Sequence, residues 1–277
     1  MQTVADIEQM YVDRLTSLYD ASEIHQLFLL LVEERLGWSR SEYLLQKKAG
    51  LDDRNTEWFM EVLNDLSMAK PVQYVLGFTW FMNMKLVVNS AVLIPRPETE
   101  ELVGLIIYQL REMGNYSPRV IDIGTGSGCI ALALKHAFPD ATVDALDASG
   151  EALRVASQNA ERLGLTVNTI QADILEWDVV FQSEQVYDVV VSNPPYIPQS
   201  EAKEMHRNVL EYEPHTALFV DDSSPLLFYD HIANFAARHL VPGGRLYFEV
   251  NRAYARQVSA LLTKKGYTDV HYHLDIH

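Results

Sequence analysis

The chain has 277 residues, which allows one large domain or two smaller ones, and 48% of them are hydrophobic, enough for a packed core. Its 38 acidic and 22 basic residues give a net charge of −16, which argues against tight binding to nucleic acid, because such binding needs Lys and Arg to displace the counterions of phosphates. A single cysteine excludes an internal disulfide, no apolar run reaches the roughly 18–20 residues of a membrane span, and the first residues lack a secretory signal, so we expect a cytoplasmic protein.

Residues 1–70 are predicted to form a small helical bundle. Apolar residues recur at helical spacing in two early stripes, one around Tyr11 and one around Phe28. The run from Ser39 to Glu42 has the form of a capping box, and Asn55 is a candidate cap for a further helix. Such short helices need one another to bury their apolar faces, so we expect them to pack together as a bundle.

Residues 71–95 are predicted to connect this bundle to the rest of the chain. Short β runs at 78–81 and 84–88 indicate a hairpin with Asn83 near its turn. Pro97 then suits the first turn of a helix that we expect to end at 113, and the acidic residues after Pro97 favour the positive end of that helix.

Residues 96–277 alternate between helix and strand. The predicted strands are 119–123, 142–147, 167–171, 186–192 and 245–250, and the predicted helices after the one that begins at Pro97 are 128–138, 150–163, 226–239 and one that ends at 265. Alternation at this spacing predicts an α/β fold with a doubly wound, mostly parallel sheet. The run Pro242-Gly243-Gly244 indicates a tight turn before the fifth strand, and residues 270–277 alternate like one more strand.

A glycine turn from Gly124 to Gly128 follows the first strand of this predicted sheet. Glycines permit a tight turn and let a ligand approach the backbone closely. A glycine turn alone is weak evidence, because dinucleotide-binding folds also use one. The GxGxG spacing, in place of GxGxxG, and Asp122 two residues before the turn point away from a nicotinamide enzyme.

Acidic residues follow the next two strands. Asp147 could accept both hydroxyls of a ribose, or it could cap the helix that begins near Ser149. Asp173 could accept an exocyclic adenine amine, or it could be a solvated loop acid. Ligands of open α/β sheets bind at the carboxyl ends of strands, which makes both residues candidates for a nucleotide-like cofactor.

The run Asn193-Pro194-Pro195-Tyr196 ends the predicted strand 186–192 and is the most informative stretch of the chain. The Asn193 side-chain oxygen and the Pro194 carbonyl can each accept one N–H of a planar amide or amino group, while Tyr196 packs on its flat face. The alternative is a Pro-Pro loop that only ends a strand, since proline cannot continue a ladder.

Together these motifs resemble the class I S-adenosylmethionine-dependent methyltransferases that carry an (Asn/Asp/Ser)-Pro-Pro-(Tyr/Phe) tetrapeptide. With the runs from Pro71 to Gly77 and from Leu93 to Glu101, the chain resembles the release factor glutamine N5-methyltransferases (PrmC/HemK family) over essentially its whole length. The ordered combination is far more specific than any one motif. The resemblance implies methyl transfer from S-adenosylmethionine to the side-chain amide of the glutamine in the Gly-Gly-Gln loop of peptide chain release factors.

The resemblance also implies roles for individual residues. The expected cofactor-binding residues are Gly124, Thr125, Gly126, Ser127, Gly128, Asp147, Asp173 and Asn193. The expected substrate-binding residues are Asn193, Pro194, Pro195 and Tyr196, with Asn193, Pro194 and Tyr196 acting in catalysis. The segment from Arg96 to Thr99 is expected to form part of a lid over the cofactor, and the N-terminal bundle to recognise the release factor. We expect a monomer without a metal site, because the histidines show no metal-ligand spacing.

Some positions depart from the common family pattern. They are Ile174 and Leu175 after Asp173, the run Glu249-Val250-Asn251 after the fifth strand, and the run from Asp221 to Pro225. Methyltransferases of this class also typically add a final antiparallel strand, for which the sequence shows no pattern.

Two other function classes stay open. A nucleic-acid methyltransferase acting on adenine N6 or guanine N2 could use the same tetrapeptide on an extruded base, although the net charge of −16 counts against it. A non-catalytic binding module with this fold is disfavoured by the intact glycine turn, Asp147 and Asn193.

Overall fold

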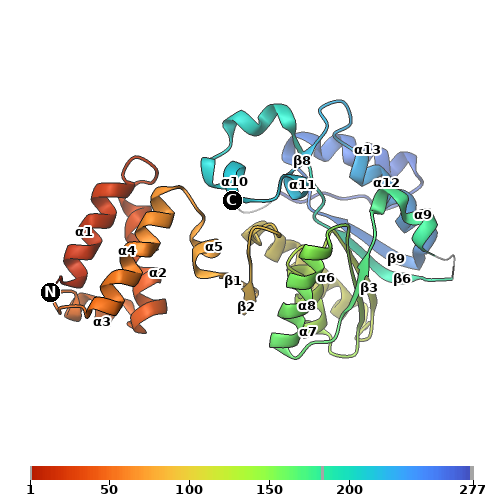
Figure 1. The fold of residues 1–277 in the computed structure, drawn as a ribbon. Helices are drawn as coiled ribbons and strands as arrows, with labels where there is room; N and C mark the ends of the chain where they lie inside the picture. The colour runs from red at the N-terminus through yellow and green to blue at the C-terminus, as the bar shows by residue number, and fades with distance from the viewer. Residues whose placement is uncertain (1, 182–183, 275–277) are drawn as a thin grey trace. The chain divides into compact units, whose positions relative to one another are not determined.

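The computed structural model describes residues 2–181 and 184–274, which form two compact units (Figure 1). One unit consists of Met1–Leu76 with Arg207–Tyr212, and the other of Gly77–His206 with Glu213–His277. The helical unit therefore extends six residues beyond the predicted boundary at residue 70, to Leu76. It also takes in a short helix from far along the chain, which no local sequence pattern indicates.

The first unit is built from the short helices α1 (Val4–Leu15), α2 (Ala21–Leu36), α3 (Arg40–Gln46), α4 (Asp53–Ser67), α5 (Val72–Leu76) and α10 (Arg207–Tyr212). Residues of α1 to α5 share one apolar core, to which α10 contributes no buried residue. Tyr11, Phe28 and Phe59 are fully buried, and the Phe28 ring lies 5.1 Å from that of Tyr11 and 5.6 Å from that of Phe59. The Tyr11 hydroxyl donates to the Phe59 carbonyl at 2.6 Å, so this buried polar group is satisfied. The two predicted stripes thus form a common core.

Side chains at the helix ends set where the helices of this unit begin. The predicted capping box is confirmed, because the Ser39 hydroxyl accepts from the Glu42 N–H at 3.3 Å and the Glu42 carboxylate accepts from the Ser39 N–H at 2.8 Å. The prediction that Asn55 caps α4 was wrong. Asp52 is the cap, and it accepts from the Asn55 N–H at 2.7 Å. A carboxylate is a strong cap, so α4 begins before Asn55.

The second unit contains a five-stranded parallel sheet, which confirms the predicted doubly wound α/β fold. Its strands are β3 (Arg119–Ile123), β4 (Thr142–Asp147), β5 (Asn168–Gln171), β6 (Tyr187–Ser192) and β9 (Leu240–Phe248), in the spatial order β5-β4-β3-β6-β9. From β3 the chain first builds the β4 and β5 side, and then returns to place β6 against the other edge of β3. This reversal makes the gap between β3 and β6 the topological switch point, where open α/β sheets bind ligands.

Helices cover both faces of the sheet (Figure 1). One face carries α6 (Pro97–Glu112), α7 (Cys129–Ala137) and α8 (Gly150–Leu163), and the other carries α12 (Leu227–His239) with α13 (Ala255–Lys264) beside it. Val189 and Val191 belong to one apolar cluster and Val190 to the other. A strand buried on both faces explains the continuous apolar run that the sequence shows there.

The predicted hairpin is confirmed as β1 (Phe78–Phe81) and β2 (Met84–Val87). Its two turn residues, Met82 and Asn83, have φ of 47° and 62°, as a tight hairpin turn requires. The hairpin is an integral part of the second unit, because Phe81, Met84 and Leu86 are buried in the same apolar cluster as residues of α6, α7 and α8.

Two expectations about the late strands need correction. The Pro-Gly-Gly run lies inside β9, where Gly243 has φ of 81° and the pairing with β6 shifts register, so it forms an irregularity in the strand and not a turn before it. The strand that was predicted over 245–250 runs from Leu240 to Phe248, so Glu249 lies just beyond its end. Residues 270–274 form no strand, and the rest of the predicted run, 275–277, lies outside the described residues.

Short elements that the sequence did not predict complete the second unit. They are α9 (Trp177–Val180), α11 (His215–Leu218) and a two-stranded parallel sheet of β7 (Ile197–Pro198) and β8 (Phe219–Val220). The small sheet ties the chain just after the Asn-Pro-Pro-Tyr run to the segment around Phe219.

Candidate active site

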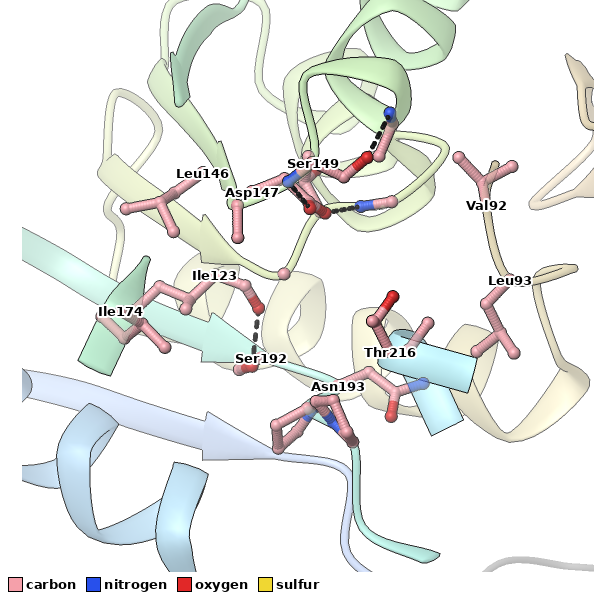
Figure 2. A pocket seen from close by; sticks show the side chains of 18 of the residues that line it. Val92, Leu93, Ile123, Leu146, Asp147, Ser149, Ile174, Ser192, Asn193 and Thr216 are labelled. Atoms are coloured by element: carbon pink, nitrogen blue, oxygen red, sulfur yellow. Dashed lines mark hydrogen bonds between the residues drawn. The ribbon is translucent and has the colours of Figure 1, made fainter. Parts of the chain in front are cut away.

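A cavity of about 650 Å³ lies at the carboxyl ends of β3, β4 and β6, at the switch point of the sheet. Figure 2 shows Asp147 and Ser149 across this cavity from Asn193 and Thr216, with Val92 and Leu93 on a further side. The predicted site residues that line it are Gly124, Thr125, Gly126, Ser127, Asp147, Asp173, Asn193, Pro194 and Pro195. Gly128 and Tyr196 are not among the lining residues.

The glycines of the turn are required for different reasons. Gly126 has φ of +54°, and a side chain added there would meet nothing within 4 Å, so the space beside its backbone is open to a ligand. Gly128 has φ of +82°, and a Cβ there would lie 3.1 Å from both the Ala156 Cβ and the Leu132 Cδ1. Gly126 therefore leaves room for a ligand, while Gly128 permits the close packing of α7 against α8.

Asp122 stabilises the glycine turn through hydrogen bonds from its buried carboxylate. Its carboxylate is fully buried and accepts from the Thr125 hydroxyl at 2.6 Å and from the Ala131 N–H at 3.2 Å. Burial raises the pKa of Asp122 to about 7, against these two hydrogen bonds, which lower it. The acid that precedes the turn in the sequence thus joins the turn to the start of α7.

The Asp147 carboxylate faces the cavity and is oriented by two backbone groups (Figure 2). Its Oδ2 accepts from the Gly126 N–H and its Oδ1 from the Ser149 N–H, both at 2.9 Å. The cap of α8 is Ser149, whose hydroxyl accepts from the Ala152 N–H at 3.2 Å, so the alternative reading of Asp147 as the helix cap was wrong. Each carboxylate oxygen keeps an acceptor position for a ligand hydroxyl.

Asp173 is exposed, as the alternative of a loop acid expects, and its role toward an adenine amine stays a prediction. Its Oδ1 accepts from the Leu175 N–H at 2.9 Å and caps a short 3-10 helix, Ile174–Glu176, while the residue also lines the cavity. Ile174 and Leu146 provide apolar surface in the same cavity, suited to a flat ring (Figure 2).

Asn193 is held from behind by residues of two other elements. Its Nδ2 donates to the Thr99 Oγ1 on α6 at 3.3 Å, and the Thr99 hydroxyl donates to the Glu249 Oε2 beyond β9 at 2.6 Å. The Tyr196 hydroxyl donates to the other carboxylate oxygen of Glu249 at 3.2 Å. Burial raises the pKa of Glu249. In the sequence, Glu249 stood out only as part of a departure from the family pattern. A single acidic residue after a strand does not predict which side chains it will contact, so its hydrogen bonds with Thr99 and Tyr196 could not be foreseen.

A second carboxylate that the sequence did not reveal anchors the predicted lid. The Glu213 side chain is 1% exposed, accepts from the Arg96 guanidinium at 2.5 Å, and also accepts from the Ile94 N–H at 3.2 Å. Residues 91–93, 95 and 96 line the cavity, as do 214, 216, 217 and 219. Glu213 therefore ties together two cavity walls that are more than a hundred residues apart in the chain.

The cavity fits S-adenosylmethionine in size and in chemistry. Its volume of about 650 Å³ falls within the range of small-molecule sites. It offers a carboxylate for hydroxyl groups, an open space beside Gly126, and apolar walls. Among the described residues, no cluster of His, Cys, Asp and Glu could hold a metal ion. No helix in the part of the chain that the structure describes is long and apolar enough to cross a membrane.

Comparison with known proteins places this architecture in a family. The family model of the methyltransferase small domain matches residues 104–214, and that of the PrmC N-terminal domain matches residues 9–77. The release factor glutamine methyltransferase of Flavobacterium psychrophilum is 39% identical over 275 residues, which cover 99% of this chain and 95% of that protein. The enzyme of the same name from Bacteroides thetaiotaomicron is 39% identical over 262 residues, covering 95% and 92%.

The chain belongs to the release factor glutamine methyltransferases. It is an S-adenosylmethionine-dependent methyltransferase, which confirms the predicted class, cofactor and fold. A solved methyltransferase structure from Pyrococcus furiosus is also similar, with 18% identity, a TM-score of 0.49 and coverage of 71% of this chain and 85% of that one. The roles of individual site residues in this release factor glutamine methyltransferase stay predictions.

Proposed function

We propose that the chain transfers a methyl group from S-adenosylmethionine to the side-chain amide nitrogen, N5, of the glutamine in the Gly-Gly-Gln motif of peptide chain release factors. The orientation of Asn193 carries the substrate assignment. Its Nδ2 is already engaged with Thr99, so its oxygen is available to accept an amide N–H in the cavity. The names of the relatives support the same substrate.

The chemistry requires an amide nitrogen to act as a nucleophile. S-adenosylmethionine supplies an electrophilic methyl group on a sulfonium. The lone pair of an amide nitrogen is delocalised into its carbonyl, so the protein must position the group closely. The Asn193 oxygen and the Pro194 carbonyl accept the two amide hydrogens, aim the nitrogen, and stabilise its positive charge as the nitrogen–carbon bond forms and the sulfur–carbon bond breaks. The nitrogen then becomes strongly acidic and loses its proton to water.

The remaining predicted residues act on the cofactor. The backbone from Gly124 to Ser127 lies beside its methionine end, Asp147 accepts its ribose hydroxyls, and Asp173 accepts its adenine amine. The positions of Asp147 and Asp173 in one cavity support this assignment. Gly128 contributes through helix packing, which keeps the turn in place.

Incubation with labelled S-adenosylmethionine tests the substrate directly. We expect label on an intact release factor, and none on the same factor with its Gly-Gly-Gln glutamine changed to alanine. RNA and DNA should stay unlabelled, because the net charge of −16 disfavours binding to nucleic acid. Label on nucleic acid, with none on the release factor, would contradict the proposal and support an exocyclic-amine methyltransferase.

We propose that the helical unit recognises the release factor, because cofactor and amide chemistry are both supplied by the other unit. A fragment that begins at Gly77 should bind the cofactor and methylate a short Gly-Gly-Gln peptide, but should act poorly on the intact factor. The fragment starts there because a start at Leu93 would remove the buried hairpin residues Phe81, Met84 and Leu86. Circular dichroism checks its folding. Equal activity of fragment and full chain on the intact factor would show that the helical unit is not needed for recognition.

A further inference from the structure

Four polar side chains, two in the cavity wall and two behind it, form a connected chain of hydrogen bonds. Asn193 Nδ2 donates to Thr99 Oγ1, Thr99 donates to Glu249 Oε2, and Tyr196 donates to Glu249 Oε1, at 3.3, 2.6 and 3.2 Å. The residues come from α6 and from the ends of β6 and β9. Thr99 is 2% exposed, so its hydroxyl depends on these partners.

The direction of every bond in this network follows from the carboxylate. In its ionised form the Glu249 carboxylate only accepts hydrogen bonds, so Thr99 must then give its single proton to Glu249. The Thr99 oxygen can then only accept, which requires the Asn193 amide to present its NH₂ group. The Asn193 oxygen is thereby left on the opposite side of the amide. A neutral donor at position 249 would remove this constraint and permit the Asn193 amide to turn over.

Glu249 does not touch the cavity that holds the reacting groups. Thr99 and Asn193 line that cavity and Glu249 does not, so Glu249 acts through them. Its side chain is buried, which raises its pKa, while hydrogen bonds from Thr99, Tyr196 and Asn193 lower it. A buried carboxylate destabilises the fold unless its hydrogen bonds are formed. Loss of one partner of Glu249 is therefore expected to disturb the whole network.

We propose that Glu249 and Thr99 are positioning residues that set the orientation of the Asn193 amide, so that its oxygen and not its NH₂ group faces the substrate nitrogen. The proposal rests on the proposed function, because an acceptor at Asn193 is needed only if the substrate presents an N–H. It also assigns Tyr196 a second task, since its hydroxyl occupies the other oxygen of the same carboxylate.

The test compares Glu249→Gln, Thr99→Val and Thr99→Ser in the full chain. Glu249→Gln keeps size but adds a donor, and Thr99→Val removes the hydroxyl that links the two side chains. We expect both to lower kcat by about 10- to 100-fold, the usual effect of removing a group that orients a functional side chain. Affinity for S-adenosylhomocysteine should change less than about twofold, since neither side chain supplies a cofactor hydrogen bond in this assignment. Thr99→Ser, which restores the hydroxyl, should recover most of kcat.

A second readout does not depend on activity. In ¹⁵N-labelled protein without cofactor, the Asn193 side-chain NH₂ resonances, identified by their loss in Asn193→Ala, should exchange slowly with solvent. They should shift and exchange faster in Glu249→Gln and in Thr99→Val, but not in Thr99→Ser. Matched controls are Glu112→Gln, an exposed acid on α6, and Thr142→Val, an exposed threonine at the start of β4, both of which should behave as wild type.

The outcomes separate this inference from the proposed function. If the wild-type protein methylates no release factor, the proposed function fails, whatever the Asn193 resonances show. If the wild-type protein is active and Glu249→Gln keeps its kcat and its Asn193 resonances, the positioning role is wrong while the function stands. If Thr99→Ser is as impaired as Thr99→Val, packing and not the hydroxyl is responsible, which also overturns the proposal.

Discussion

Replacing Asn193 with alanine is expected to lower the rate of methyl transfer by about 100- to 1,000-fold, which corresponds to about 2.7–4 kcal/mol of transition-state stabilisation. The variant loses the side-chain oxygen that we propose accepts a substrate N–H, and with it the orientation that this contact would impose. The fold should persist, because Asn193 lies beyond the end of β6 and outside the apolar clusters of the sheet. Single-turnover rates with a release factor measure the effect, and a thermal melt checks the fold.

Asn193→Asp provides the finer comparison. It keeps an acceptor but replaces the NH₂ group that donates to Thr99, so we expect a rate above that of the alanine variant and below that of wild type. Asn234→Ala, at an exposed position on α12, is the control for loss of an asparagine elsewhere. Wild-type rates in both Asn193 variants would mean that the Asn-Pro-Pro-Tyr run only ends a strand.

Replacing Gly126 with valine is expected to weaken cofactor binding by about 100-fold, which corresponds to about 2.7 kcal/mol. The new side chain would fill the open space beside the turn, and φ of +54° disfavours a β-branched residue. Both effects act where Asp147 accepts from the Gly126 N–H, so the carboxylate would also be displaced. Calorimetric titration with S-adenosylhomocysteine measures the change in affinity.

Gly114→Val is a matched control for the backbone effect alone. Gly114 is exposed, has φ of +66°, and a side chain there would also meet nothing within 4 Å, but it lies outside the cavity. It should lose a similar amount of stability and keep full cofactor affinity. Equal loss of affinity in both variants would show that backbone strain, and not the space beside Gly126, explains the result.

Features that depend on neighbours in the chain could be predicted from the sequence. Continuous apolar runs predicted the buried strands, because a strand covered on both faces has no polar side, and the structure places Val190 and its neighbours in opposite clusters. The capping box at Ser39 is likewise local, since both of its hydrogen bonds join residues three apart. Asn55 shows the limit of such reasoning. Both Asp52 and Asn55 can cap a helix, and the structure shows that Asp52 caps α4.

Features that depend on contacts between distant segments could not be predicted. Glu213 meets Arg96 across 117 positions and Glu249 meets Thr99 across 150, and neither acid lies in a pattern that marks a partner. The helix α10 joins the first unit although it follows β6 by more than ten residues in the chain.

The sequence by itself determined the alternation of helices and strands, the glycine turn, and the Asn-Pro-Pro-Tyr run at the end of a strand, because each depends on backbone preferences and spacing within a few residues. Only the tertiary structure decided which of these residues share one cavity, and which way the Asn193 amide faces. Parallel strands bring the ends of β3, β4 and β6 to one edge, so residues from Gly124 to Asn193 meet there. The direction of the amide is set by Glu249 through Thr99, by contacts that exist only once the sheet and α6 have packed.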